Sequence, residues 1–193
     1  ARQRVAAALH DLGPGLGDWR HVTPAVAVCE DQPLDLRLRV PGEHNRMNAT
    51  LAVAACEAAH VRRRLAVDAL ATFAGLPHRL EHVRRVGEVD YFNDSKSTTP
   101  ESARLAIDCF ASGSVHVILG GYDKQADLTA LAEYAAVRCA GVYTIGATGE
   151  AIAAAAERAA RAQASGSGGA VARCGALDRA VAEASGSARP GQV

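Results

Sequence analysis

The sequence predicts an α/β fold with a mainly parallel sheet, and three observations support this prediction. In the later part of the chain, short apolar runs alternate with alanine-rich segments of helical periodicity. The connections between them are short, and two of the apolar runs end in glycine. Repeated strand–helix units of this kind favour parallel strands with helices on both faces of the sheet. The length of 193 residues allows one full domain or parts of two.

The composition excludes several classes of protein. The chain carries 21 basic and 21 acidic residues, and this balance argues against a nucleic-acid surface, which needs clustered excess Lys and Arg. Its five cysteines are scattered without a CxxC pair, which indicates reduced thiols rather than a disulfide framework. No apolar run approaches the roughly 20 residues that span a bilayer, and the chain opens without a signal peptide. We therefore expect a soluble, cytoplasmic protein that neither enters a membrane nor binds nucleic acid.

The first part of the chain is predicted to be mostly helical. A first helix stops at Gly13-Pro14, a typical helix end. Residues 34–40, LDLRLRV, alternate apolar and charged side chains, which predicts a strand with one exposed face. The turn PGEHNRMN then leads into helices at about 45–59 and 65–73.

The break at Gly75-Leu76-Pro77 divides the chain into two predicted domains, residues 1–75 and 76–193. At the start of the second, LEHVRRV and EVDYF flank Gly87 and can pair as a hairpin. Further strands are expected at SVHVILGG, VYTIG and AVARC. Further helices are expected from Pro100, from Asp127 or Thr129, at about 149–162 and at about 177–184. The stretch SGSGG is predicted to be a flexible loop.

The stretch FNDSKSTTPES lies where a predicted strand ends and a helix begins. Pro100 suits an early helical position, and either Thr98 or Thr99 can serve as the N-cap. Glu101 is placed to close a capping box on Thr98. One interpretation of the stretch is therefore a well-capped helix.

Capping leaves two charged side chains of this stretch, Asp94 and Lys96, unexplained. A helix N-terminus beside an ammonium group and hydroxyls is a site for an anion. Lys124, in LGGYDKQAD after the next strand, can project into the same crevice, because ligands of α/β sheets bind beyond the carboxyl ends of the strands. Together the two lysines favour a compact substrate that bears carboxylates. An ordinary glycine turn with a surface lysine remains the alternative.

Two further motifs suggest nucleotide contacts. Arg79, in GLPHRLE, can reach a phosphate or ribose, although a surface arginine on a strand would look the same. Asn45 and Asn48 lie three apart at a helix start, so one can cap the helix and the other can hydrogen-bond a base edge. GATGEA, at residues 146–151, matches a dinucleotide loop only loosely. The sequence has no GxxxxGK[ST] loop and no histidine spacing typical of a metal site.

Four stretches, taken in order, resemble the later part of a Mur ligase: PGEHNRMNA, LATFAGLPHRLE, YFNDSKSTTPESA and VILGGYDKQADLTAL. The NDSK element is the discriminating one and is similar to that of the members that add D-glutamate. The resemblance implies a three-domain cytoplasmic ligase of peptidoglycan synthesis, which uses ATP and Mg²⁺. Such an enzyme activates the carboxylate of UDP-N-acetylmuramoyl-L-alanine as an acyl phosphate, which the amine of D-glutamate attacks. We also expect a monomer.

The resemblance also assigns roles to individual positions. The residues expected to bind the nucleotide are Asn48, His78, Arg79 and Asp94. Those expected to bind D-glutamate are Ser95, Lys96, Thr98 and Lys124, and the two lysines are also expected to contact the reacting phosphate. By the same resemblance, the first predicted domain is the end of a central ATPase domain, and the second is most of a Rossmann-like C-terminal domain that binds the amino acid.

The two ends of the sequence predict a piece of a longer enzyme. The chain begins without Met inside a helical pattern and stops at RPGQV, where a turn leads toward another strand. We expect the phosphate loop and Mg²⁺ ligands before Ala1 and the last D-glutamate-binding segment after Val193, so that this piece alone is inactive. Two alternatives remain open: a Mur ligase that adds a different amino acid, and a non-catalytic Rossmann-like module that binds a nucleotide or a partner protein.

Overall fold

The computed structural model describes residues 28–29, 32–33, 36–123, 125–163 and 169–193. The chain forms two compact units, Ala1–Gly75 and Leu76–Val193, which we describe separately. The predicted first helix, Lys124 and all but the last residue of the SGSGG loop lie outside the described residues.

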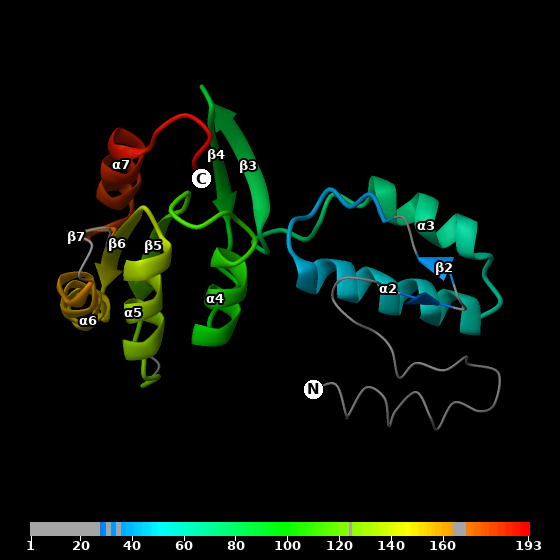
Figure 1. Ribbon diagram of the computed structural model, residues 1–193, viewed down its shortest axis with the longest axis horizontal. Coiled ribbons are helices and arrows are strands. Elements are labelled where there is room, and N and C mark those ends of the chain that lie inside the picture. The colour runs from blue at the N-terminus through cyan, green and yellow to red at the C-terminus, as the bar shows by residue number, and fades with distance from the viewer. Residues whose placement is uncertain (1–27, 30–31, 34–35, 124, 164–168) are drawn as a thin grey trace. The chain divides into compact units, whose positions relative to one another are not determined.

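The described part of the first unit contains two helices and a short hairpin (Figure 1). The helices are α2 (Glu43–Ala58) and α3 (Arg63–Thr72), and both lie close to their predicted positions. The strands β1 (Val28–Cys29) and β2 (Gln32–Pro33) pair antiparallel. Val53 of α2 and Ala66 of α3 are buried in a shared apolar cluster, which holds the two helices together.

The predicted strand at residues 34–40 is wrong where the structure describes it, because residues 36–40 form no strand. Leu36 is nevertheless buried, in the cluster that also contains Ala49 and Val53, and Leu38 packs against this cluster. The guanidinium of Arg46 donates to the Leu36 carbonyl at 3.0 Å. The alternating pattern therefore reports which side chains are buried, whereas a strand also needs a neighbouring strand to take its backbone hydrogen bonds.

The second unit alternates strands and helices as predicted (Figure 1). Its elements are β3 (Glu81–Val86), β4 (Val89–Asn93), α4 (Pro100–Ile107), β5 (His116–Gly121), α5 (Thr129–Arg138), β6 (Gly141–Gly146), α6 (Gly149–Ala162), β7 (Ala170–Gly175) and α7 (Leu177–Ser187). The β3 and β4 strands form the predicted antiparallel hairpin. The β5, β6 and β7 strands are parallel, with β6 in the middle. These strands confirm the predicted α/β class.

Helices cover both faces of the parallel sheet. Val142 of β6 packs into the cluster formed with α4, α5 and α6, whereas its neighbour Tyr143 packs into the cluster formed with α7. Successive side chains of a strand point to opposite faces, so these clusters lie on opposite sides of the sheet. In Figure 1, α7 accordingly lies apart from α4, α5 and α6. Burying a side chain of this size contributes roughly 1.5–3 kcal/mol.

Alanine dominates where α5 and α6 meet. Ala132, Ala135 and Ala136 of α5 and Ala155 and Ala156 of α6 are all buried in the same core cluster. Alanine has the highest helix propensity, and its small side chain lets neighbouring helices approach closely. These properties explain how alanine-rich segments form the helical layer of the core.

The last residues of the chain connect the hairpin to the parallel sheet. The N–H of Gly191 donates to the Glu88 carbonyl at 2.8 Å, on the hairpin side. On the other side, the N–H of Val193 donates to the Ser114 carbonyl at 2.9 Å, and the N–H of His116 donates to the Val193 carbonyl at 2.7 Å. The C-terminal residues therefore run between β4 and β5 and hold the two sheets side by side.

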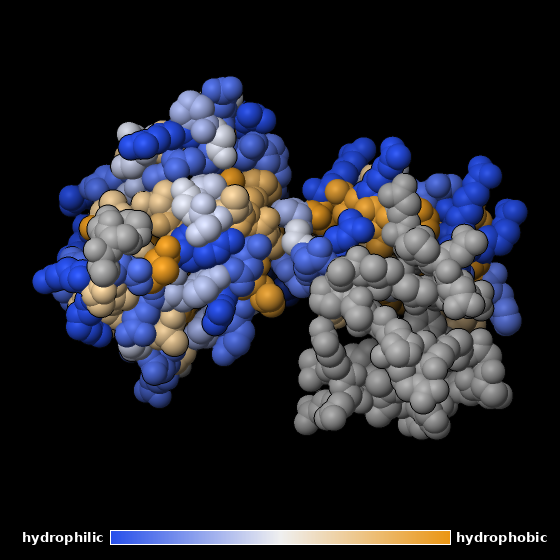
Figure 2. Space-filling model, viewed as in Figure 1, coloured by the Kyte–Doolittle hydropathy of each residue, from blue (hydrophilic) through white to orange (hydrophobic). Residues whose placement is uncertain are grey.

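The visible surface of the second unit is mostly hydrophilic, with apolar residues spread among the polar ones (Figure 2). Its exposed large apolar side chains include Val83 and Val86 of β3 and Leu177 and Val181 of α7. In the described part of the chain, no helix combines the length and the apolar character that crossing a bilayer requires.

Gly120, at the end of β5, provides a test of this packing. Its φ of 120° disfavours a side chain, and an added Cβ would collide with the Ile145 carbonyl of β6. We predict that Gly120→Ala destabilises the second unit by roughly 2–5 kcal/mol, from backbone strain and overpacking together. Urea unfolding followed by circular dichroism measures the loss.

Gly113 is a matched control, because its φ is also positive, at 73°, but a Cβ there would meet open space. Gly113→Ala should cost only the backbone strain, roughly 1–2 kcal/mol. Equal losses for the two variants would show that the close approach of β5 and β6 does not constrain Gly120.

Candidate functional site

The Asp94 carboxylate joins two turns next to the sheet. Its Oδ1 atom accepts the N–H of Leu80 at 2.9 Å, and its Oδ2 atom accepts the hydroxyl of Ser97. Leu80 is 7% exposed and has a positive φ of 45°, so a buried and strained turn is held by this carboxylate. Asp94 thus ties the turn before β3 to the loop after β4.

Further hydrogen bonds link the same two segments. The N–H of Lys96 donates to the His78 carbonyl at 3.1 Å, and the Asn93 amide nitrogen lies 2.8 Å from Nδ1 of His78. The N–H of Ser95 donates to the Asn93 side-chain oxygen at 3.1 Å. The structure therefore brings four of the predicted site residues, His78, Asp94, Ser95 and Lys96, into one hydrogen-bonded group. Arg79 lies in the same turn with an exposed side chain.

Thr99 is the residue that caps α4. Its hydroxyl accepts the N–H of Ser102 at 3.3 Å, and the Ser102 hydroxyl accepts the N–H of Thr99 at 3.2 Å. The capping box is therefore closed by Ser102, and the prediction that Glu101 closes it on Thr98 is wrong. With Thr99 as the N-cap, the third helical position falls on residue 102 rather than 101. The Thr98 side chain is left to line the neighbouring cavity.

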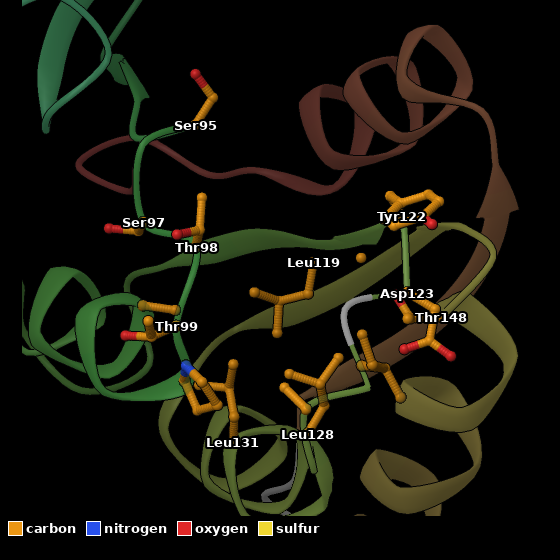
Figure 3. A pocket seen from close by; sticks show the side chains of 15 residues that line it. Ser95, Ser97, Thr98, Thr99, Leu119, Tyr122, Asp123, Leu128, Leu131 and Thr148 are labelled. Atoms are coloured by element: carbon orange, nitrogen blue, oxygen red, sulfur yellow. The ribbon is translucent and has the colours of Figure 1, made fainter.

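A cavity of about 270 Å³ lies at the carboxyl end of β5 and the N-terminus of α4 (Figure 3). Its polar side chains come from three loops: Ser95, Ser97, Thr98 and Thr99 before α4, Tyr122 and Asp123 after β5, and Thr148 before α6. Its apolar lining includes Ala103, Leu119, Leu128, Leu131 and Ile152. A cavity of this volume suits a compact ligand.

The α4 side of the cavity is suited to a negatively charged group. The N-terminus of a helix carries a partial positive charge and unpaired backbone N–H groups. Beside it stand the hydroxyls of Thr98 and Thr99, which can donate hydrogen bonds, whereas the hydroxyl of Ser97 already donates to Asp94. This arrangement can bind a carboxylate or a phosphate.

A thiol close to Asp94 does not add a nucleophile to this region. Burial raises the pKa of Cys109 to about 11, with smaller contributions from the charges of Asp94 and Asp108. The thiolate is the reactive form of cysteine, and at neutral pH such a thiol stays protonated. The chemistry of the cavity therefore depends on hydroxyls, charges and the helix N-terminus.

The structure places the remaining predicted site residues in different ways. Ser95 and Thr98 line the cavity, whereas Lys96 is exposed and is not part of its lining. Asn48 is exposed on α2 in the first unit. Lys124 lies outside the described residues, so the convergence of the two lysines stays a prediction.

The expected side-chain cap of α2 is absent, because its N-cap is Gly42 and no side chain caps it. Asn45, one of the two asparagines proposed for this role, instead donates from its side chain to the Pro41 carbonyl at 2.6 Å. Within the described residues, no three His, Cys, Asp or Glu side chains gather in a group that could hold a metal ion.

Sequence reasoning missed several residues of the cavity: Ser97, Tyr122, Asp123 and Thr148 line it without having been predicted as site residues. Thr148 belongs to GATGEA, which resembles a dinucleotide loop only loosely. The position of Thr148 in the sequence could have identified it as a site residue, because it follows β6, the parallel neighbour of β5. Loops after adjacent parallel strands meet at the same edge of a sheet.

Residues 78–193 match the family described as "Mur ligase, glutamate ligase domain". The chain belongs to the Mur ligase family. It is 40% identical over 152 residues to the UDP-N-acetylmuramoylalanine–D-glutamate ligase of Acidobacterium capsulatum, a match that covers 79% of this chain and 31% of that protein. It is 41% identical over 98 residues to the ligase of the same name from Escherichia coli K12, which covers 50% of this chain and 22% of that protein. The matches thus span about a third or less of these curated relatives.

Solved structures of other Mur ligases and related enzymes share the fold. The UDP-N-acetylmuramate-alanine ligase MurC of Thermotoga maritima superposes with a TM-score of 0.55 at 21% identity, over 65% of this chain and 29% of that one. A pseudomurein peptide ligase type C from Methanothermus fervidus gives a TM-score of 0.56 at 16% identity. This match covers 85% of this chain and 35% of that one. At these identities the likeness shows that this Mur ligase chain has the fold of the family.

The role of Asp94 in joining the two turns can be tested through the amide of Leu80. We predict that Asp94→Ala speeds hydrogen exchange at this amide, because a buried N–H then loses its acceptor, at a cost of about 1–3 kcal/mol. Hydrogen exchange with peptide-level mass spectrometry measures the change over residues 78–82.

Asp90→Ala, in the preceding strand β4, is the control. Asp90 pairs at the surface with His82 and Arg85, and exposed pairs contribute about 0–1 kcal/mol. If both variants left the exchange of residues 78–82 unchanged, Asp94 would not hold this turn.

Proposed function

We propose that this chain is part of an ATP-dependent ligase that adds D-glutamate to UDP-N-acetylmuramoyl-L-alanine in peptidoglycan synthesis. The observation that carries the proposal is the cavity between α4 and β5, which suits a compact carboxylate and lies within the matched Mur ligase domain. Relatives that are 37–41% identical over the matched parts are named as ligases of this substrate pair, which supports the choice of D-glutamate.

In this reaction, ATP with Mg²⁺ supplies the phosphoryl group that activates the acceptor carboxylate as an acyl phosphate. The residues of this chain would bind the amino acid and orient its amine. Ser95, Thr98 and the N-terminus of α4 would receive a carboxylate of D-glutamate. Lys96 and Lys124 would add positive charge near the acidic substrate and the reacting phosphate. Because no metal-binding group occurs among the described residues, we assign no Mg²⁺ ligand to them.

We further propose that Asn48, His78, Arg79 and Asp94 contribute to the nucleotide site. Both carboxylate oxygens of Asp94 already accept hydrogen bonds from Leu80 and Ser97. Asp94 would therefore act largely by shaping the turn that presents Arg79, whose planar guanidinium suits phosphate. In this proposal, residues 1–75 are the end of the central ATP-binding domain, and residues 76–193 belong to the domain that brings in the amino acid. The enzyme would act in the cytoplasm as a monomer.

Amino-acid-dependent phosphate release tests the proposal directly. The whole protein is given ATP, Mg²⁺ and UDP-N-acetylmuramoyl-L-alanine together with D-glutamate, L-alanine or meso-diaminopimelate. We expect D-glutamate to give the fastest release. A preference for another amino acid would identify a different Mur ligase, and nucleotide binding without any phosphate release would identify a non-catalytic module.

Lys124 provides a second test in the whole protein. We predict that Lys124→Ala weakens the use of D-glutamate by roughly 2–5 kcal/mol in kcat/KM, because an anion would lose its charged partner. Steady-state kinetics with varied D-glutamate measure the loss, and Gln125→Ala in the same loop serves as the control. An unchanged KM and kcat in Lys124→Ala would remove this lysine from the site.

A further inference from the structure

The two sides of the cavity differ in their chemistry (Figure 3). Figure 3 shows Ser97, Thr98 and Thr99 together on one side, where the chain enters α4. Asp123 and Thr148 lie on the opposite side, and Leu119 lies between the two groups. A ligand that fills the cavity would therefore contact hydroxyls at one end and a carboxylate at the other.

Among the described residues that line the cavity, Asp123 is the only one with a formal charge. The residues between β5 and α5 hold its side chain, because Oδ1 of Asp123 accepts the N–H of Gln125 at 2.7 Å. The N–H of Thr148 donates to the Gly121 carbonyl at 3.3 Å, which ties the start of α6 to the end of β5. An ionised carboxylate has about four acceptor positions, so this bond leaves Asp123 able to accept others.

Among the described residues, Asp123 gives one end of the cavity a negative charge. A carboxylate attracts an ammonium group and repels another anion, whereas the α4 side attracts an anion. The apolar side chains between them, such as Leu119 and Leu131, suit the methylene groups of a small aliphatic molecule. A zwitterionic amino acid has an ammonium group, an anionic group and an aliphatic part, whereas inorganic phosphate has only the anionic group.

We propose that Asp123 binds the α-ammonium group of the incoming amino acid while a carboxylate of the same molecule lies at the N-terminus of α4. This inference rests on the proposed function, and it assigns Asp123 as a residue that orients the amine. It also predicts that the site distinguishes an amino acid from a dicarboxylate that lacks the amine.

The test compares D-glutamate with glutarate, which has the same carbon chain and both carboxylates but no amine. Isothermal titration calorimetry with the whole protein gives the Kd of each compound, and competition in the phosphate-release assay provides a second measurement. In the wild type we expect D-glutamate to bind several-fold more tightly than glutarate. In Asp123→Asn we expect the Kd for D-glutamate to rise about three- to tenfold while that for glutarate stays the same or falls.

Asp127→Asn is the matched control, since it removes the same charge from the same loop outside the cavity. Oδ1 of Asp127 accepts the N–H of Thr129 at 2.9 Å, and an asparagine oxygen can keep this bond. The control should leave the ratio of the two Kd values unchanged. Asp123→Glu, which keeps the charge, should recover part of the preference for D-glutamate.

The possible results separate the inference from the proposed function. If the wild type releases phosphate with D-glutamate but Asp123→Asn keeps the wild-type ratio of the two Kd values, the assignment of Asp123 is wrong and the function stands. An equal loss of both ligands in Asp123→Asn, as from a disturbed loop, would also overturn the assignment. If the wild type neither binds nor uses D-glutamate, the proposed function is wrong and the inference falls with it.

Discussion

The carboxylate of Asp94 is the interaction on which the candidate site depends. It accepts the buried N–H of Leu80 and the hydroxyl of Ser97, and so joins the turn before β3 to the loop after β4. Leu80 adopts a positive φ, which a side chain disfavours by roughly 1–2 kcal/mol, so this turn needs such a partner. Because Asp94 fixes the start of the loop and the Thr99 cap fixes its end, the hydroxyls between them are held beside the cavity.

The second constraint is the order of the strands. The C-terminal residues hydrogen-bond to Glu88 on one side and to Ser114 and His116 on the other, and so hold β4 beside the parallel sheet. The loops after β4, β5 and β6 then meet at one edge, and each supplies polar side chains to the same cavity. This is the edge where ligands bind in open α/β sheets, so topology explains why the cavity lies there.

The chemistry of the cavity is consistent with the family to which the chain belongs. One side offers a helix N-terminus with hydroxyls, and the other offers the carboxylate of Asp123. In our proposal, this polarity lets a Mur ligase hold an amino acid by its ammonium group and one carboxylate, with its amine in a defined direction. Holding the attacking amine in a fixed direction lowers the barrier of a ligation reaction, because the reacting atoms are already aligned.

The sequence by itself determined the local elements of this protein. Apolar periodicity and the glycine breaks predicted a helix at residues 149–162, and these are the bounds of α6 in the structure. They also predicted the β3–β4 hairpin and the parallel strands. These predictions succeeded because the patterns report which side chains are buried. The same patterns failed at residues 36–40, where a strand would need a partner, and at the capping box, where a shift of one residue moved the bond from Glu101 to Ser102. Only the tertiary structure decided that Tyr122, Asp123 and Thr148 join the hydroxyls before α4 in one cavity. The physical reason is that pairing between strands distant in sequence brings their loops together, and no local pattern records which strands will pair.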